Sequence, residues 1–171
     1  VPSTATPEAQ RNMLADSAVK GLFVSDDYRE AALDQFLDLP SIRSELRFAL
    51  ESACDVFSDH WVWAGQFPTV SPNIQMALDE EYDILYSSGT TGMPKGIIHS
   101  HLARHLLISG TQAMDFEGAT VLTSTPLYSN TTITTWWPSV WVGATQIIMR
   151  KFNAEQANEL VRDYQVTHAM L

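Results

Sequence analysis

The segment at positions 87–96, Ser-Ser-Gly-Thr-Thr-Gly-Met-Pro-Lys-Gly, combines the groups that a polyphosphate ligand needs. Its glycines let a ligand approach the main chain closely, and its four hydroxyl groups lie beside exposed backbone N–H groups. Lys95 adds one long, mobile positive charge. A loop of this kind, placed after a strand, can surround an anion. The segment therefore predicts a loop that binds the phosphates of ATP.

The same segment does not fit the loop of the P-loop NTPases. That loop, G-x-x-x-x-G-K-[ST], needs a Ser or Thr after its lysine to hold magnesium, and a helix that begins there. Here Pro94 precedes Lys95, Gly96 follows it, and the β-like pair 97–98 comes next. The P-loop class is therefore excluded.

The segment is, however, similar to the signature phosphate loop of the adenylate-forming superfamily, which includes acyl-CoA and aryl-CoA ligases, luciferases and peptide-synthetase adenylation domains. That signature, [ST]-S-G-T-T-G-x-P-K-G, matches at every specified position of 87–96. Ser100-His101 resembles the [ST]-H pair that follows the loop, and Thr125-Pro-Leu-Tyr128 resembles the next motif, where the chain meets the acyl substrate. Nearly the whole chain is covered, although residues 41–75 match weakly.

The resemblance implies an enzyme that joins a carboxylic acid to ATP, giving an acyl-adenylate and pyrophosphate, and then passes the acyl group to a thiol, usually CoA. Charge builds on the departing phosphates, so fixed donors there lower the barrier. By resemblance, the residues that hold the phosphates are Ser87, Ser88, Gly89, Thr90, Thr91, Gly92 and Lys95. The alternatives are an amino-acid adenylation domain and a non-catalytic nucleotide-binding or interaction module.

The residues expected at the acid follow the second motif. By resemblance they are Tyr128, Ser129, Asn130 and Trp137. Many acyl-CoA ligases have a histidine where this chain has Ser129, and the smaller residue leaves room. The neighbouring segment 131–141 offers indole and aliphatic surface. We therefore expect a medium-to-long fatty acid, or an aromatic or ring-bearing acid, in preference to acetate.

Three further parts of the family pattern do not occur in these residues: the Tyr-Gly-x-Thr-Glu motif, whose glutamate serves magnesium; the Thr-Gly-Asp motif, which grips the ribose; and the small C-terminal domain with its catalytic lysine. The chain opens at Val1 and stops inside the apolar run 166–171. Domains more often end in exposed polar segments. We therefore expect residues 1–171 to be part of the large N-terminal domain, truncated at both ends and inactive alone, with the Mg²⁺ ligand outside it.

Composition and the remaining motifs argue against other classes. Twenty acidic residues against ten basic ones give a net charge of −10, which would repel a nucleic acid. Cys54 is the single cysteine, so neither an internal disulfide nor a CxxC pair exists. His101 and His105 have the spacing of a zinc pair but lack the glutamate of H-E-x-x-H, so no metal site is expected.

No apolar run approaches the ~20 residues of a membrane span, and no signal peptide is visible, so a cytoplasmic protein is expected.

The elements that must position these groups alternate between helix and strand. Apolar spacing predicts helices over 7–16, 27–37, 101–114, 131–142 (interrupted at Pro138) and 154–164. It predicts strands over 21–24, 84–86, 96–100, 119–123, 146–149 and from 166 onward. Residues 46–50 fit either state, and Trp61 and Trp63 alternate as packing residues on a half-buried strand. The expected fold is α/β, a mostly parallel sheet flanked by helices.

Overall fold

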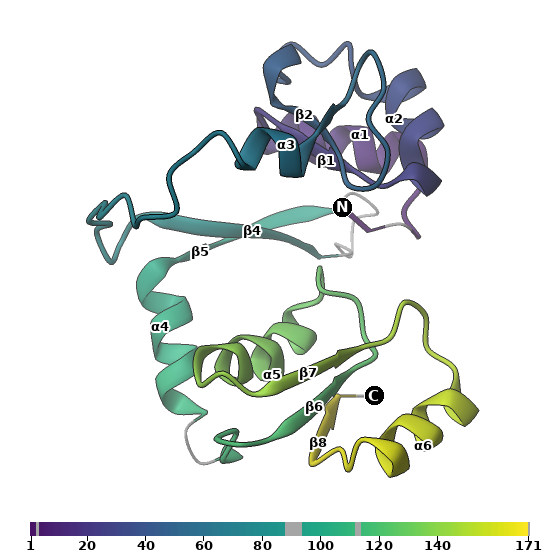
Figure 1. The fold of residues 1–171 in the computed structure, drawn as a ribbon. Helices are drawn as coiled ribbons and strands as arrows, with labels where there is room; N and C mark the ends of the chain where they lie inside the picture. The colour runs from purple at the N-terminus through teal and green to yellow at the C-terminus, as the bar shows by residue number, and fades with distance from the viewer. Residues whose placement is uncertain (3, 88–93, 112–113, 171) are drawn as a thin grey trace. The chain divides into compact units, whose positions relative to one another are not determined.

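The computed structural model describes residues 1–2, 4–87, 94–111 and 114–170 (Figure 1). The chain divides into two compact units. One contains Val1–Gln75 and Tyr86–Gly96, and the other contains Met76–Leu85 and Ile97–Leu171. Within the described residues, no helix is long and apolar enough to cross a membrane.

The first unit is a small parallel sheet covered by short helices. Its sheet has the strand order β1-β2-β3, and both neighbouring pairs are parallel. The elements in chain order are α1 (Pro7–Asp16), β1 (Leu22–Val24), η1 (Asp26–Tyr28), α2 (Arg29–Gln35), η2 (Ser44–Leu46), β2 (Arg47–Ala49), β3 (Ser58–Asp59) and α3 (His60–Ala64). The segment whose state the sequence leaves open is thus a strand, β2, between two partners.

The first helix begins where its residue types predict. Thr6 is its N-cap, with Oγ1 accepting a hydrogen bond from Ala9 N at 3.3 Å, and Pro7 is the first helical residue. Leu14 on this helix packs with Leu39 and Ile42 in one buried cluster. The cap and the buried face together fix α1, whose last turn matters for the phosphate loop.

The strand predicted around Trp61 and Trp63 is wrong, because these residues lie in the short helix α3. The reason is the preceding Asp59, whose Oδ1 accepts hydrogen bonds from Trp61 N at 2.7 Å and Val62 N at 2.9 Å. Such a carboxylate cap satisfies the free N–H groups of a first helical turn. Trp63 packs on Phe48 with ring centroids 4.6 Å apart, whereas Trp61 is 74% exposed, so the packing prediction holds for Trp63 alone.

Two strands enclose the expected phosphate loop. They are β4 (Glu81–Ser87) and β5 (Lys95–Ser100), which pair with each other as a two-stranded sheet. Both are longer than the sequence predicts. The pair contributes residues to both units, because the tip residues Tyr86–Gly96 group with the first unit and the remaining residues group with the second.

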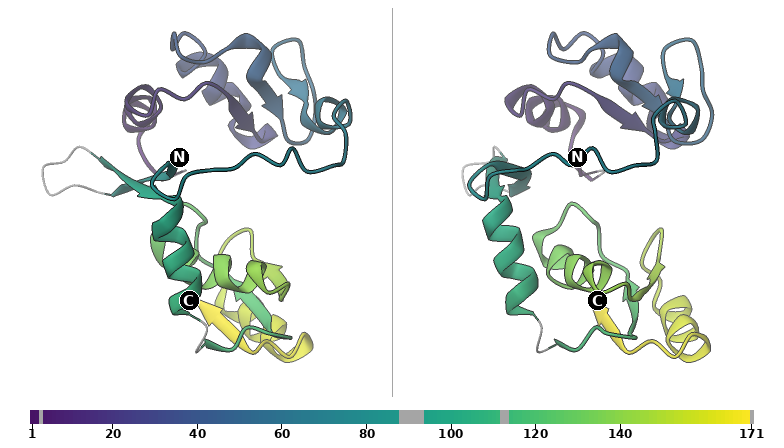
Figure 2. Two further views of the ribbon diagram at one scale, coloured as in Figure 1. Left: turned by 90° about the vertical axis from the view of Figure 1, so that its left-hand side faces the viewer. Right: turned by 60° about the vertical axis from the view of Figure 1, so that its left-hand side comes forward.

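The second unit repeats strand and helix around a parallel sheet of order β7-β6-β8 (Figures 1 and 2). Its elements are α4 (His101–Gly110), β6 (Thr120–Thr123), α5 (Asn130–Trp141), β7 (Thr145–Ile148), α6 (Ala154–Asp163) and β8 (His168–Met170). Val121 and Leu122 of the central strand are 1% and 0% exposed. Neighbouring strand residues point to opposite faces, so both faces of this sheet are covered, as parallel sheets require. The α/β prediction is therefore confirmed.

The predicted interruption of α5 at Pro138 is wrong, because the helix runs on to Trp141 with Pro138 inside it. A proline removes one helical hydrogen bond, but the following turn still closes here, since Val142 N donates to Pro138 O at 3.3 Å. The helix stops before Gly143, whose φ of +74° is the left-handed conformation that ends many helices.

Candidate functional site

The predicted phosphate loop joins the two paired strands. Ser87 is the last residue of β4, and Lys95 is the exposed first residue of β5. Ser88, Gly89, Thr90, Thr91 and Gly92 lie outside the residues that the structure describes. The strands on either side of the predicted loop are therefore as predicted, and the roles of these seven residues stay a prediction.

The residue before the loop is fastened to α1. The Tyr86 hydroxyl lies within donating distance of Asp16 Oδ2, at 2.6 Å, and of Met13 O, at 3.1 Å. Burial and the hydrogen bond to Asp16 raise the pKa of Tyr86 above its usual range. A hollow of about 400 Å³ adjoins this contact and is lined by Asn12, Met13, Asp16, Tyr86, Pro94, Lys95 and Gly96. The last turn of α1 and both ends of the loop thus share one open space that contains Lys95.

A buried arginine binds side chains near the end of the strand pair that lies opposite the loop. Arg104 on α4 is only 6% exposed and forms a two-pronged ion pair with Asp83 of β4, with Nε–Oδ2 at 2.8 Å and Nη2–Oδ1 at 2.9 Å. His99 Nδ1 of β5 lies 2.8 Å from the same Asp83 Oδ1. The third guanidinium nitrogen, Nη1, donates to Asn130 Oδ1 at 3.0 Å. A buried charge is tolerated when its hydrogen-bonding capacity is met in this way.

No motif predicts this cluster, although one signal in the sequence points to it. Arg104 lies in a largely apolar helical run, whereas Asp83 ends the acidic stretch 79–83, just before the apolar residues 84–86. Charged groups in such places need partners, because burying them unpaired costs several kcal/mol. Which partner each finds depends on how the elements pack, and spacing along the chain does not reveal that.

Aromatic rings make a second connection between β4 and α5. The Tyr82 ring packs edge-on against His101, with centroids 5.0 Å apart, and against Trp137, with centroids 5.7 Å apart. Burial and the charge of Asp83 raise the pKa of Tyr82. His101, at the start of α4, and Trp137, from the predicted acid-binding set, therefore both contact one residue of β4.

The predicted acid-binding motif follows β6, at the carboxyl edge of the parallel sheet. Ligands of α/β sheets usually bind at this edge. The turn is held by Thr132, whose hydroxyl donates to Pro126 O at 2.7 Å and lies 2.7 Å from Thr125 Oγ1. Of the predicted residues, Tyr128 and Ser129 are half-buried and Asn130 is exposed as the first residue of α5. The structure thus places Asn130 and Trp137 on one helix, where Asn130 contacts Arg104 of α4 and Trp137 contacts Tyr82 of β4.

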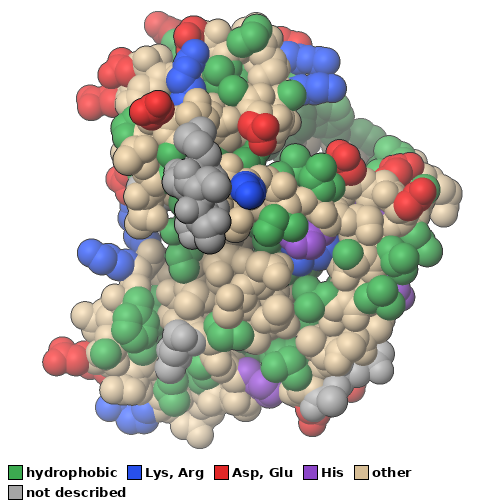
Figure 3. All heavy atoms as spheres, turned by 180° about the vertical axis from the view of Figure 1, so that it is seen from behind, with side chains coloured by type: hydrophobic (Ala, Val, Ile, Leu, Met, Phe, Trp, Pro, Cys, Tyr) green, Lys and Arg blue, Asp and Glu red, His purple; other side chains and the backbone are tan. Residues whose placement is uncertain are grey.

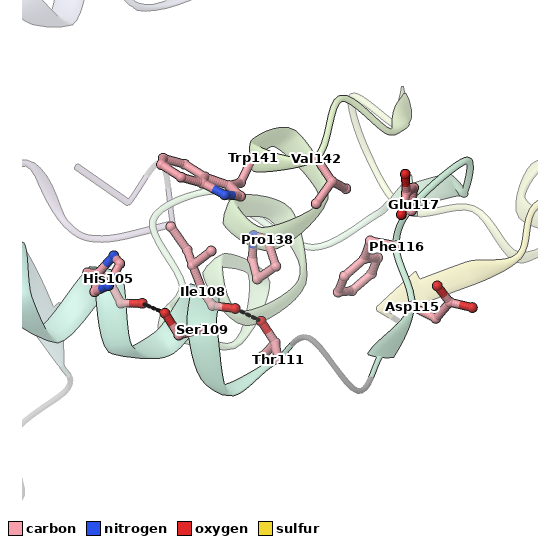
Figure 4. A pocket seen from close by; sticks show the side chains of 10 residues that line it. All are labelled: His105, Ile108, Ser109, Thr111, Asp115, Phe116, Glu117, Pro138, Trp141 and Val142. Carbon is pink, nitrogen blue, oxygen red and sulfur yellow. Dashed lines mark hydrogen bonds between the residues drawn. The ribbon is translucent and has the colours of Figure 1, made fainter.

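A cavity that the sequence does not predict lies beside the last turns of α4 and α5 (Figure 4). Its volume is about 360 Å³. The hydroxyls of Ser109 and Thr111 donate to carbonyls of their own helix, so they could meet a ligand only as hydrogen-bond acceptors. The lining residues are His105, Ile108, Ser109, Thr111, Asp115, Phe116, Glu117, Pro138, Trp141 and Val142.

The described part of the chain has no metal-ligand cluster. Over 1–2, 4–87, 94–111 and 114–170, the structure has no group of three His, Cys, Asp or Glu side chains that could hold a metal ion. On the face shown in Figure 3, Lys and Arg side chains occur in small groups among acidic ones.

Comparison with known proteins identifies the family of this chain. The chain matches the family model described as AMP-binding enzyme over residues 1–171. It is 31% identical over 105 residues to 2-succinylbenzoate–CoA ligase of Bacillus licheniformis, an alignment that covers 60% of this chain and 22% of that protein. It is 34% identical over 107 residues to 4-coumarate:CoA ligase 1 of Petunia hybrida, covering 56% and 19%.

Solved structures show the same fold. The N-terminal domain of FACL13 from Mycobacterium tuberculosis superposes with a TM-score of 0.77 at 21% identity, covering 99% of this chain and 42% of that one. The anthranilate CoA ligase AuaEII, solved with anthranoyl-AMP, gives a TM-score of 0.79 at 20% identity, covering 99% and 34%.

The described part of the chain is an α/β segment with the fold of the FACL13 N-terminal domain and of AuaEII. The chain belongs to the AMP-binding enzyme family, and the curated relatives named above are CoA ligases. It spans about a fifth of the length of those relatives.

Proposed function

We propose that this chain supplies the phosphate loop and part of the acid site of an AMP-forming acid–CoA ligase. The observation that carries the proposal is the complete signature at 87–96, joined at Ser87 and Lys95 to two paired strands. The family match over residues 1–171 supports the same reading.

In the first step the carboxylate of the acid attacks the α-phosphorus of ATP, and the bond to the pyrophosphate oxygen breaks. Negative charge develops on the departing pyrophosphate. A loop of backbone N–H donors, hydroxyls and one lysine can stabilise this charge. Ser87, Ser88, Gly89, Thr90, Thr91, Gly92 and Lys95 carry these donors. In the second step CoA takes the acyl group, and AMP leaves.

Magnesium bound to ATP would neutralise charge on the phosphates. By the family resemblance, its protein ligand is the glutamate of the Tyr-Gly-x-Thr-Glu motif, which does not occur in residues 1–171. A cytoplasmic location is proposed because ATP and CoA are plentiful there.

The acid is proposed to be a medium-to-long fatty acid or a ring-bearing acid. Ser129 is small, and the α5 segment beyond it offers Trp137 and apolar surface. The names of the two curated relatives include ring-bearing acids, which agrees with this choice. An amino-acid adenylation domain fits less well, because both relatives are CoA ligases.

The test uses the full-length protein with ATP, Mg²⁺, CoA and a panel of acids. We expect acid-dependent exchange of pyrophosphate into ATP without CoA, and formation of AMP and acyl-CoA when CoA is added. Formation of ADP, or exchange that does not depend on any acid or amino acid, would contradict an AMP-forming ligase. Exchange with amino acids alone would identify the adenylation-domain alternative.

A further inference from the structure

The buried ion pair between Arg104 and Asp83 fixes the orientation of the Asn130 side-chain amide. Asp83 occupies Nε and Nη2 of Arg104, which leaves Nη1 to donate to Asn130 Oδ1 at 3.0 Å. A guanidinium is only a donor, so the atom of Asn130 that faces it is the carbonyl oxygen. The amide nitrogen of Asn130 therefore points away from Arg104, with two N–H donors.

These donors are not used within the described part of the chain. Asn130 is exposed, and the single hydrogen bond of its side chain to another described residue is the one from Arg104. It is also the first residue of α5, directly after the turn that follows β6. The donors are thus offered at the carboxyl edge of a parallel sheet, where ligands bind.

The residue type at 130 is itself informative. An aspartate would have the same shape, would pair with Arg104, and would be favoured by the dipole at the start of a helix. Asparagine gives up that electrostatic stabilisation and gains two donors.

We propose that Asn130 donates a hydrogen bond to an oxygen of the acid substrate, and that Arg104 is the positioning residue that holds the Asn130 amide in this orientation. This inference rests on the proposed ligase function. It assigns to the acid a hydrogen-bond acceptor oxygen, either of the reacting carboxylate or of a substituent on its tail.

The decisive variant is Asn130→Asp in the full-length protein. It keeps an oxygen toward Arg104 but replaces both N–H donors by an acceptor. We expect an unchanged or higher melting temperature, a KM for the acid that rises roughly tenfold or more, and an unchanged KM for ATP.

Arg104→Lys should also raise the KM for the acid, because one ammonium group cannot hold Asp83 and Asn130 together. Asn158→Asp is the matched control, because it makes the same chemical change at an exposed residue of α6, which the acid site does not include.

Two acids separate the two kinds of oxygen. Phenylpropenoate has only its carboxylate, whereas 4-hydroxyphenylpropenoate also has a tail hydroxyl. If Asn130→Asp raises the KM of both, the reacting carboxylate is the acceptor, and if it raises only the second, the tail oxygen is. An unchanged KM for both acids, or a melting temperature well below that of the wild type, would overturn the inference. Acid-dependent pyrophosphate exchange by the wild type tests the ligase function separately, so the two failures are distinguishable.

Discussion

The hydroxyl of Tyr86 lies 2.6 Å from Oδ2 of Asp16, which joins the residue before the phosphate loop to the last turn of α1. The two residues are 70 positions apart in the sequence. The contact involves the strand that carries the loop, and it lies within one unit of the chain. It therefore fixes one end of the loop to a helix that is itself capped and buried.

Tyr86→Phe should lower the free energy of unfolding by about 0.5–1.5 kcal/mol, the usual net value of a hydrogen bond. It should also change the pH dependence. The pKa of Tyr86 is raised in the folded state, so its contribution is fully present below about pH 10 and is lost as the pH rises through the raised pKa. Chemical unfolding between pH 8 and 11 should therefore show a shallower decline for Tyr86→Phe than for the wild type. Equal slopes would show that the contact does not favour the neutral phenol.

Lys95→Ala in the full-length protein should slow acid-dependent pyrophosphate exchange by roughly 30- to 900-fold. Loss of one charge-assisted contact to the phosphates removes about 2–4 kcal/mol of transition-state stabilisation. Thr91→Val should act in the same direction more mildly, because it removes one neutral donor. Lys151→Ala, which removes an exposed lysine away from the loop, is the control and should leave the rate unchanged. Normal exchange by Lys95→Ala would mean that the lysine does not hold the phosphates.

Much of the second unit could be predicted from the sequence, because its signals are local. Val121 and Leu122 lie in a short apolar run, which is the pattern of a strand covered on both faces. Asn153 caps α6, because its side-chain oxygen accepts a hydrogen bond from Gln156 N at 2.9 Å. Caps and buried runs act within a few residues, so the alternation of strand and helix is visible without a structure.

The rest could not be predicted, because it depends on contacts between distant residues or on one competing local interaction. The alternation of Trp61 and Trp63 indicates a strand, yet the Asp59 cap closes a helical turn there. The chain of contacts from Asp83 through Arg104 to Asn130 joins three elements, and no periodicity encodes their packing. The sequence supplies Asn130 as a candidate, and only the structure shows which of its two polar atoms remains available.

Arg104→Met should be strongly destabilising. It leaves Asp83 half-buried without its ion-pair partner, and breaking a buried pair on one side costs about 3 kcal/mol or more. Urea unfolding of the variant should show a lower midpoint with a similar slope. Asp38→Asn is the comparison, because the Arg11–Asp38 pair is exposed and its loss should not measurably change stability. Equal effects of the two substitutions would show that burial does not set the value of the Arg104 pair.

The size of the residue at 129 should set the preference between acids. Ser129 is half-buried just before α5, and we propose that its small side chain leaves space for an apolar acid. Each methylene that the acid buries contributes ~0.8 kcal/mol, so octanoate or an arylpropenoate should have a kcat/KM well above that of acetate. Ser129→His should narrow this ratio, because the imidazole occupies the space that the larger acids need. Ser129→Ala is the control, since it keeps the space and removes only the hydroxyl, and it should retain the preference. A wild-type preference for acetate, or a ratio that Ser129→His leaves unchanged, would show that this position does not border the acid.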